Sequence, residues 1–129
     1  MTADHSDSAT LPSILVVDDE PDLLIVMAAR LKDDYHVEVA SSAAEADVLL
    51  GMQHFDLVIS DHLMPNEEGL EFLMRVAQHF PATKRILVTG YLNPELISRA
   101  QTLADLSGYL VKPIEGQQLL AAVAGALAT

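Results

Sequence analysis

The feature that most constrains the fold of this chain is a repeated alternation of short apolar runs with longer amphipathic segments. The runs have strand length, and the segments between them carry apolar residues three or four positions apart, which is the spacing of one helix face. Strands are predicted at Ile14–Val17, Val37–Ala40, Leu57–Ser60, Arg85–Thr89 and Tyr109–Val111. Helices are predicted at Pro21–Leu31, Ser42–Leu50, Leu70–His79, Pro94–Ala104 and Glu115–Ala128. Each predicted strand is thus followed by one predicted helix.

This alternation predicts an α/β fold, a (βα)5 chain with a doubly wound five-stranded parallel sheet. Strands that are apolar throughout indicate a sheet covered by helices on both faces. Parallel neighbours of this kind are joined by right-handed crossovers. For five strands, the flavodoxin-like order 2-1-3-4-5 is the natural expectation.

The length of 129 residues suits one domain with its own core, predicted over residues 13–129. Residues 1–12 are expected to form a flexible tail, since the first ten are polar and acidic and lack the apolar centre of a signal peptide. The absence of cysteine excludes disulfides and thiolate metal sites, and no apolar run approaches the ~20 residues that span a bilayer. We therefore expect a cytoplasmic protein.

The charge of the chain argues against two classes of partner. There are 19 acidic residues against 7 lysines and arginines, for a formal net charge of −12. Proteins that bind nucleic acid directly carry a basic face, and anionic membrane surfaces repel an acidic protein. We expect neither direct nucleic-acid binding nor membrane binding by this chain.

Polar residues that could bind a ligand or take part in a reaction follow the predicted strands, at the points where those strands end. They are Asp18, Asp19 and Glu20 after the first strand, Asp61 after the third, Thr89 at the end of the fourth and Lys112 after the fifth. Open α/β sheets bind ligands beyond the carboxyl ends of their strands. The four strands are therefore predicted to place these groups around one crevice.

The chemistry of these groups favours a divalent cation and a phosphoryl group. Two carboxylates about 4 Å apart repel each other by about 4 kcal/mol at an effective dielectric constant of roughly 20. Mg²⁺, or Mn²⁺ in its place, prefers hard oxygen ligands of this type. Asp61 could then act as a nucleophile that forms an acyl phosphate. The cation and Lys112 would balance the charge on the phosphoryl oxygens, and the Thr89 hydroxyl would bond one of them.

Four segments carry a resemblance to a known family. They are Ile-Leu-Val-Val-Asp-Asp-Glu at 14–20, Asp-Leu-Val-Ile-Ser-Asp-His-Leu-Met-Pro at 56–65 with Gly69 after it, Ile-Leu-Val-Thr-Gly at 86–90, and Tyr-Leu-Val-Lys-Pro at 109–113. With these four motifs in order at the predicted strand ends, the chain resembles the receiver domains of two-component response regulators from Ser13 to Leu127.

The resemblance implies roles for particular residues. Asp61 would be the phosphorylation site. The Mg²⁺ ligands would be Asp18, Asp19, Asp61 and the backbone carbonyl of Leu63, with Asp18 acting partly through water. Thr89 and Tyr109 would form the conformational switch, with Thr89 moving toward the phosphoryl group and Tyr109 turning inward behind it. The Lys112–Pro113 peptide would be cis.

The resemblance also implies partners and a signalling role in place of a metabolic enzyme. A histidine kinase or a histidine phosphotransfer protein would donate the phosphoryl group, and self-hydrolysis would remove it. A downstream effector or a fused output domain would receive the signal. A homodimer would form through the helices predicted at 94–104 and 115–128. Two departures from the family pattern, Glu67-Glu68 and Leu106-Ser107-Gly108, leave every chemical group in place.

Structural readings of the same residues remain open. The acidic run at 18–20 could cap the first helix, with Pro21 at its first turn. Asp61 could form an Asx turn, Tyr109 could be a half-buried core aromatic, and Lys112 could be a solvated surface residue. The histidines lie on different elements without ligand spacing, and His62 is expected to face away from the site.

Other functions also remain open. A receiver-like adaptor would work without phosphorylation. An aspartyl-phosphate hydrolase of the haloacid-dehalogenase kind would also use a strand-end Asp with Mg²⁺, but it would have Asp-x-Asp where this chain has Asp61-His62-Leu63. A flavin carrier would need a hydroxyl- and glycine-rich loop where this chain has acids at 18–20.

Overall fold

The computed structural model describes residues 11–129, so only the last two residues of the predicted tail lie inside the described part. Five parallel strands form one sheet in the order β2-β1-β3-β4-β5, which confirms the predicted topology. The strands are β1 (Ser13–Val17), β2 (His36–Ala40), β3 (Leu57–Asp61), β4 (Lys84–Thr89) and β5 (Gly108–Val111). The helices are α2 (Pro21–Leu31), α3 (Ala43–Met52), α4 (Gly69–His79), α5 (Pro94–Ala104) and α6 (Gly116–Leu127).

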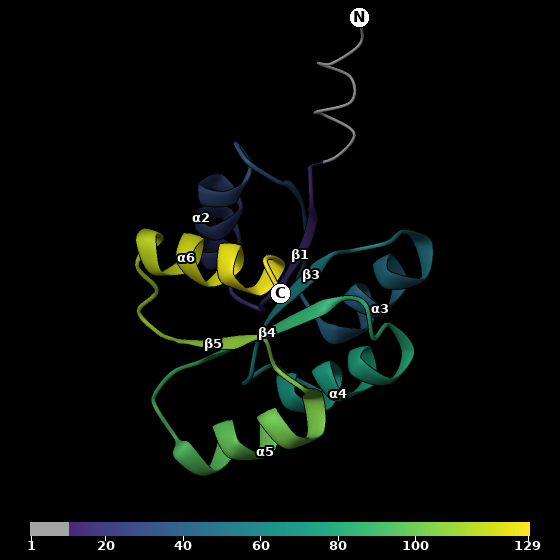
Figure 1. Ribbon diagram of the computed structural model, residues 1–129, viewed down its shortest axis with the longest axis vertical. Helices are drawn as coiled ribbons and strands as arrows, with labels where there is room; N and C mark the ends of the chain where they lie inside the picture. Colours follow the sequence, from purple (N-terminus) through teal and green to yellow (C-terminus); the bar gives the residue numbers. More distant parts are fainter. Residues whose placement is uncertain (1–10) are drawn as a thin grey trace, which may run out of the picture.

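Helices cover the sheet on both faces, as the apolar strands predicted. Figure 1 shows α2 and α6 together on one side of the sheet, and α3, α4 and α5 on the other. Successive residues of β1 point to opposite faces: Ile14 and Val16 join the core under α2 and α6, whereas Leu15 and Val17 join the core under the other three helices. This two-sided burial explains why the central strands show no polar alternation.

Local sequence signals explain where the helices begin. Ser42 caps α3 by accepting a hydrogen bond from the backbone N–H of Glu45, and the Glu45 side chain accepts one from the N–H of Ser41. Asn93 caps α5 by accepting from the first-turn amides, and Pro94 follows at the first helical position. Such capping satisfies amides that have no partner inside the helix.

Arg85 is a buried cation that the sequence pattern did not reveal. It lies in β4, and its guanidinium donates to the backbone carbonyls of Thr83, Ala104 and Asp105. These bonds join the start of β4 to the end of α5. Within residues 11–129, no helix is both long and apolar enough to cross a membrane.

Candidate metal centre

The strand register brings the acidic residues together at the carboxyl edge of the sheet. Val17 of β1 pairs with Ser60 of β3, so the next residues along these two strands, Asp18 and Asp61, lie level with each other. The strand β3 extends one residue further than predicted, so Asp61 is its last residue and not the residue that follows it. Carboxylate oxygens of Asp18, Asp19 and Asp61 all lie within 4.8 Å of one another.

The three carboxylates differ in burial. Asp18 is 2% exposed and Asp61 is 5% exposed, whereas Asp19 is open to solvent. The backbone N–H of Asp18 donates to the carbonyl of Ala40 at the end of β2. One carboxylate oxygen of Asp18 accepts from the N–H of Glu20 at 2.8 Å. Asp18 is thereby held in place from both its backbone and its side chain.

Lys112 supplies the positive charge of the site. Its Nζ lies 3.1 Å from Oδ1 of Asp61, 3.0 Å from Oε1 of Glu20 and 3.6 Å from Oδ2 of Asp18. Its backbone N–H donates to the carbonyl of Thr89, which fixes it beside the end of β4. The Lys112–Pro113 peptide bond is cis, as the resemblance implied. Lys112 is therefore not a freely solvated surface residue.

Glu20 is a partner of Lys112 that the sequence reasoning did not assign. It is the residue preceding α2, but its side chain makes no capping bond to that helix. It reaches the ammonium of Lys112 across 92 positions of sequence. The acidic run at 18–20 therefore does more than begin α2. No sequence signal indicated that Glu20 pairs with Lys112, because the two residues meet only in the folded chain.

Burial and mutual repulsion shift the ionisation of the buried acids. Burial raises the pKa of Asp61 above its ordinary value, with Asp19 and Glu20 adding to the rise and Lys112 opposing it. Burial likewise raises the pKa of Asp18, opposed by the bond from the Glu20 amide and reinforced by Asp61. Burial lowers the pKa of Lys112, but its hydrogen bonds to Glu20 and Asp61 outweigh this and raise it.

The donor set fits a hard divalent cation. The carboxylates of Asp18, Glu20 and Asp61 lie near the ammonium of Lys112, and Asp19 adds a fourth carboxylate beside Asp18 and Asp61. An excess of negative charge in a partly buried site favours either proton uptake or cation binding. Oxygen ligands of this type suit Mg²⁺, with its remaining positions filled by water.

The pKa shifts predict a pH-dependent cost in stability. In the folded protein Asp18 and Asp61 hold their protons at pH values above 3.8, where the unfolded chain has released them. Their contribution to stability is therefore greatest below that value and falls as the pH rises through the raised pKa values. Near neutral pH, metal-free Asp61→Asn should be more stable than the wild type, by on the order of 1 kcal/mol.

Urea unfolding of both proteins at mildly acidic and neutral pH would measure this effect. Mg²⁺ should stabilise the wild type near neutral pH, because it binds the ionised carboxylates of the folded state. It should have less effect on Asp61→Asn. A metal-free variant that is less stable than the wild type near neutral pH would contradict the assigned repulsion.

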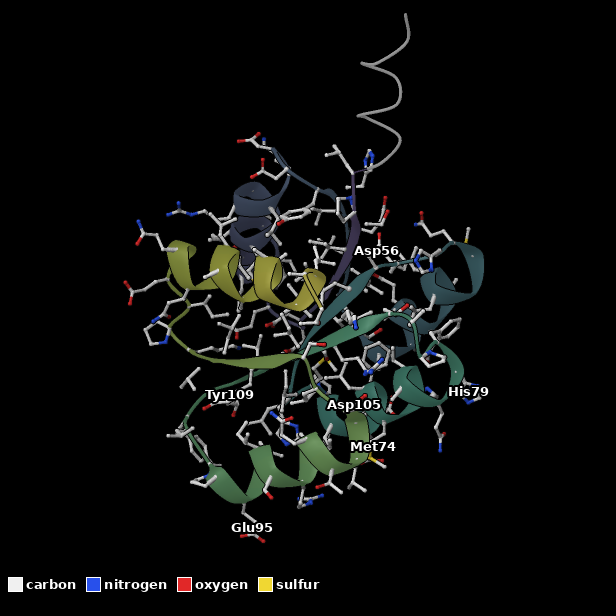
Figure 2. All side chains as sticks on the ribbon, in the orientation of Figure 1. Asp56, Met74, His79, Glu95, Asp105 and Tyr109 are labelled. Carbon is white, nitrogen blue, oxygen red and sulfur yellow. The ribbon has the colours of Figure 1, made fainter. Side chains whose placement is uncertain are left out.

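The two expected switch residues lie on neighbouring strands. Thr89 is buried at the end of β4, and its hydroxyl donates to the carbonyl of Tyr91 at 3.2 Å. Tyr109 lies in β5 and is 41% exposed. Figure 2 shows its side chain on the side of β5 that faces α5. Tyr109 is thus more exposed than a half-buried core aromatic would be.

The segment that follows Asp61 is drawn tightly against the sheet. The N–H of His62 donates to the carbonyl of Val88, and the N–H of Gly69 donates to the carbonyl of His62 at 2.7 Å. Leu63, whose carbonyl was expected to bind the metal, has an exposed side chain. The ring of His62 is buried and its Nδ1 accepts from the N–H of Leu70 at 3.4 Å, so His62 supports the start of α4.

Comparisons with known proteins agree with this arrangement. Residues 14–124 match the family described as "Response regulator receiver domain". The signal receiver domain of an HD domain-containing protein from Pseudomonas fluorescens Pf-5 is 36% identical, with a TM-score of 0.86 over 91% of this chain and 94% of that one. A response regulator receiver domain protein from Methanospirillum hungatei JF-1 is 32% identical, with a TM-score of 0.85 over 92% of this chain and 95% of that one.

A longer relative is also similar. The hydrogenase transcriptional regulatory protein HoxA of Cupriavidus necator is 35% identical over 101 residues, which is 78% of this chain and 21% of HoxA. The chain spans about a quarter or less of the length of the curated relatives named as transcriptional regulatory proteins.

Proposed function

This chain belongs to the response regulator receiver domain family, and we propose that it accepts a phosphoryl group on Asp61 beside a bound divalent cation. The observation that carries the proposal is the position of the Asp61 carboxylate. Oxygens of Asp18 and Asp19 lie within 4.8 Å of it, and the ammonium of Lys112 is 3.1 Å from its Oδ1. A bound divalent cation together with Lys112 would keep this carboxylate ionised and would offset the negative charge of an incoming phosphoryl group.

The residues of the site support an in-line transfer. A carboxylate oxygen of Asp61 forms a bond to phosphorus while the bond from phosphorus to the donor's leaving atom breaks, and the leaving atom keeps that electron pair. Lys112 exchanges one of its carboxylate contacts for a phosphoryl oxygen. Asp18, Asp19, Asp61 and the Leu63 carbonyl would hold Mg²⁺ or Mn²⁺, whose positive charge offsets the charge on the phosphoryl oxygens.

The position of Thr89 supports a role in the response to phosphorylation. Its hydroxyl is bonded to the Tyr91 carbonyl, and it would exchange this partner for a phosphoryl oxygen. Tyr109, which is partly exposed, would then turn inward behind Thr89. The two movements would shift an existing equilibrium and change the surface made by α5, β5 and α6.

The proposed partners follow from this chemistry and from the relatives. A histidine kinase or a histidine phosphotransfer protein would supply the phosphoryl group.

We take residues 13–129 as the receiver domain, since the first strand begins at Ser13 and the family match covers most of this range. An output domain or a separate effector would receive the signal, in keeping with the greater length of the relatives. Pairing of two copies through α5 and α6 is a further part of the proposal.

Intact mass spectrometry after incubation with acetyl phosphate tests the proposed function. We expect a gain of one phosphoryl group with Mg²⁺ present and none with a chelator. The adduct should survive acid and be lost in alkali, as an acyl phosphate is. An adduct that forms without divalent cation or survives alkali would lie on another kind of side chain and would contradict the proposal. A protein that binds Mg²⁺ but forms no adduct with any donor would be the phosphorylation-independent adaptor.

A further inference from the structure

One guanidinium joins α4 to α3 and to the loop that precedes α4. Arg75 of α4 donates through Nη1 and Nη2 to the two carboxylate oxygens of Glu67, both at 2.7 Å. It also donates through Nη2 and Nε to the carboxylate of Asp47 in α3, at 2.9 and 3.3 Å. The same guanidinium lies over the ring of Phe72, 5.6 Å from its centre. We refer to the contact between Glu67 and Arg75 as the loop clamp.

The loop clamp has the geometry of a strong contact. A bidentate pair between arginine and carboxylate is stronger and more directional than a single ion pair, and lysine cannot reproduce it. The Arg75 and Glu67 side chains are 35% and 25% exposed, so solvent screens the pair only in part. The bond from Arg75 lowers the pKa of Glu67 below its ordinary value.

The segment held by the loop clamp is the loop that connects β3 to α4. It runs from His62 to Glu68, between the last residue of β3 and the first of α4. Its ends are tied together by the bond from the Gly69 N–H to the His62 carbonyl. Between those ends, Asn66 takes a left-handed conformation with φ of 75°, and Glu67 follows it with its side chain on Arg75.

We propose that Glu67 and Arg75 are positioning residues for the metal centre, acting through the loop that carries the Leu63 carbonyl. Fixing Glu67 on α4 limits the positions that the loop can take, and α4 is itself held against α3 through Asp47. The proposal rests on the proposed function, since it concerns the same cation site. It assigns to Glu67 a role other than adding negative charge, because both oxygens of its carboxylate are bonded to Arg75.

The chain offers a matched pair of variants for the test. Glu67→Gln and Asp47→Asn each remove one negative charge from the same guanidinium. Only Glu67 belongs to the loop. We expect calorimetric titration with Mg²⁺ to show about tenfold weaker binding in Glu67→Gln, the usual scale for residues that orient metal ligands. Binding in Asp47→Asn should be close to that of the wild type.

Equal weakening in the two variants would indicate a charge effect alone and would overturn the proposal, as would no weakening in either. Arg75→Gln provides a second variant and should weaken Mg²⁺ binding as Glu67→Gln does. If the wild type itself does not bind Mg²⁺, that result contradicts the proposed function. Loss of binding in the variants alone concerns only the role of the loop clamp.

Hydrogen exchange of the metal-free protein gives an independent reading. The Gly69 amide closes the loop onto His62, and we expect it to exchange faster in Glu67→Gln than in the wild type or Asp47→Asn. Thermal unfolding of the three proteins would show that the fold is kept. Unchanged exchange at Gly69 and its loop neighbours in Glu67→Gln would overturn the positioning role.

Discussion

Replacing Asp61 with asparagine is expected to abolish the phosphoryl adduct that forms with acetyl phosphate and Mg²⁺. Asparagine keeps the size of the side chain but removes the charged oxygen that would attack phosphorus. It also removes one carboxylate from the cluster with Asp18 and Asp19. The loss should therefore be complete in intact mass spectra, while the far-ultraviolet circular dichroism of the variant stays that of a folded α/β protein.

Asp56→Asn is the matched control for this experiment. Asp56 immediately precedes the same strand but lies at its opposite end, where its carboxylate accepts from the N–H of Ser13. Because asparagine retains an oxygen acceptor, this variant should form the adduct as the wild type does. Phosphorylation of Asp61→Asn to the wild-type extent would place the acceptor elsewhere in the chain. Loss of the adduct in Asp56→Asn alone would do the same.

Replacing Gly69 with alanine should cause the largest loss of stability of any glycine-to-alanine substitution in the chain. A Cβ at this position would lie 2.0 Å from the backbone oxygen of Asp61 and 2.8 Å from the Cα of His62. Neither neighbour is a flexible side-chain end, so backbone must move. We expect a loss of about 3 kcal/mol in the free energy of unfolding, the upper part of the range for overpacked sites.

The same substitution should also disturb the site, because the displaced backbone belongs to Asp61 itself. Gly51→Ala serves as the control, since a Cβ there would meet open space on α3. That variant should be neutral or more stable, as expected for alanine in place of glycine in a helix. Urea unfolding of the two variants measures the difference. A Gly69→Ala protein with the wild-type midpoint would show that the close approach to Asp61 is not required.

Most of the fold could be predicted from the sequence because hydrophobic periodicity is a local property. The apolar run at Leu57–Ser60 and the helical stripe of Pro94–Ala104 can each be recognised without knowledge of the rest of the chain. The strand order was inferred from a topological rule for sheets of this kind and is confirmed. The cis bond at Lys112–Pro113 came from the family resemblance and is present.

The membership of the acidic cluster was predictable for a related reason. Parallel strands end at one edge of a sheet, so residues that follow them must meet there whatever the angles between helices. This rule is enough to bring Asp18, Asp61 and Lys112 together. The roles assigned to Thr89 and Tyr109 stay predictions, since they concern a change that follows phosphorylation.

The remaining contacts were decided by the tertiary structure alone. The pairing of Glu20 with Lys112 and the shared guanidinium of Arg75 join side chains whose reach depends on how helices and loops pack. The burial of Arg85 and the close approach at Gly69 depend on the same packing. Sequence periodicity determines which face of an element is apolar, but not the distance or angle at which two elements meet. That geometry sets the interactions of long polar side chains and the close approaches of backbone segments, such as that at Gly69.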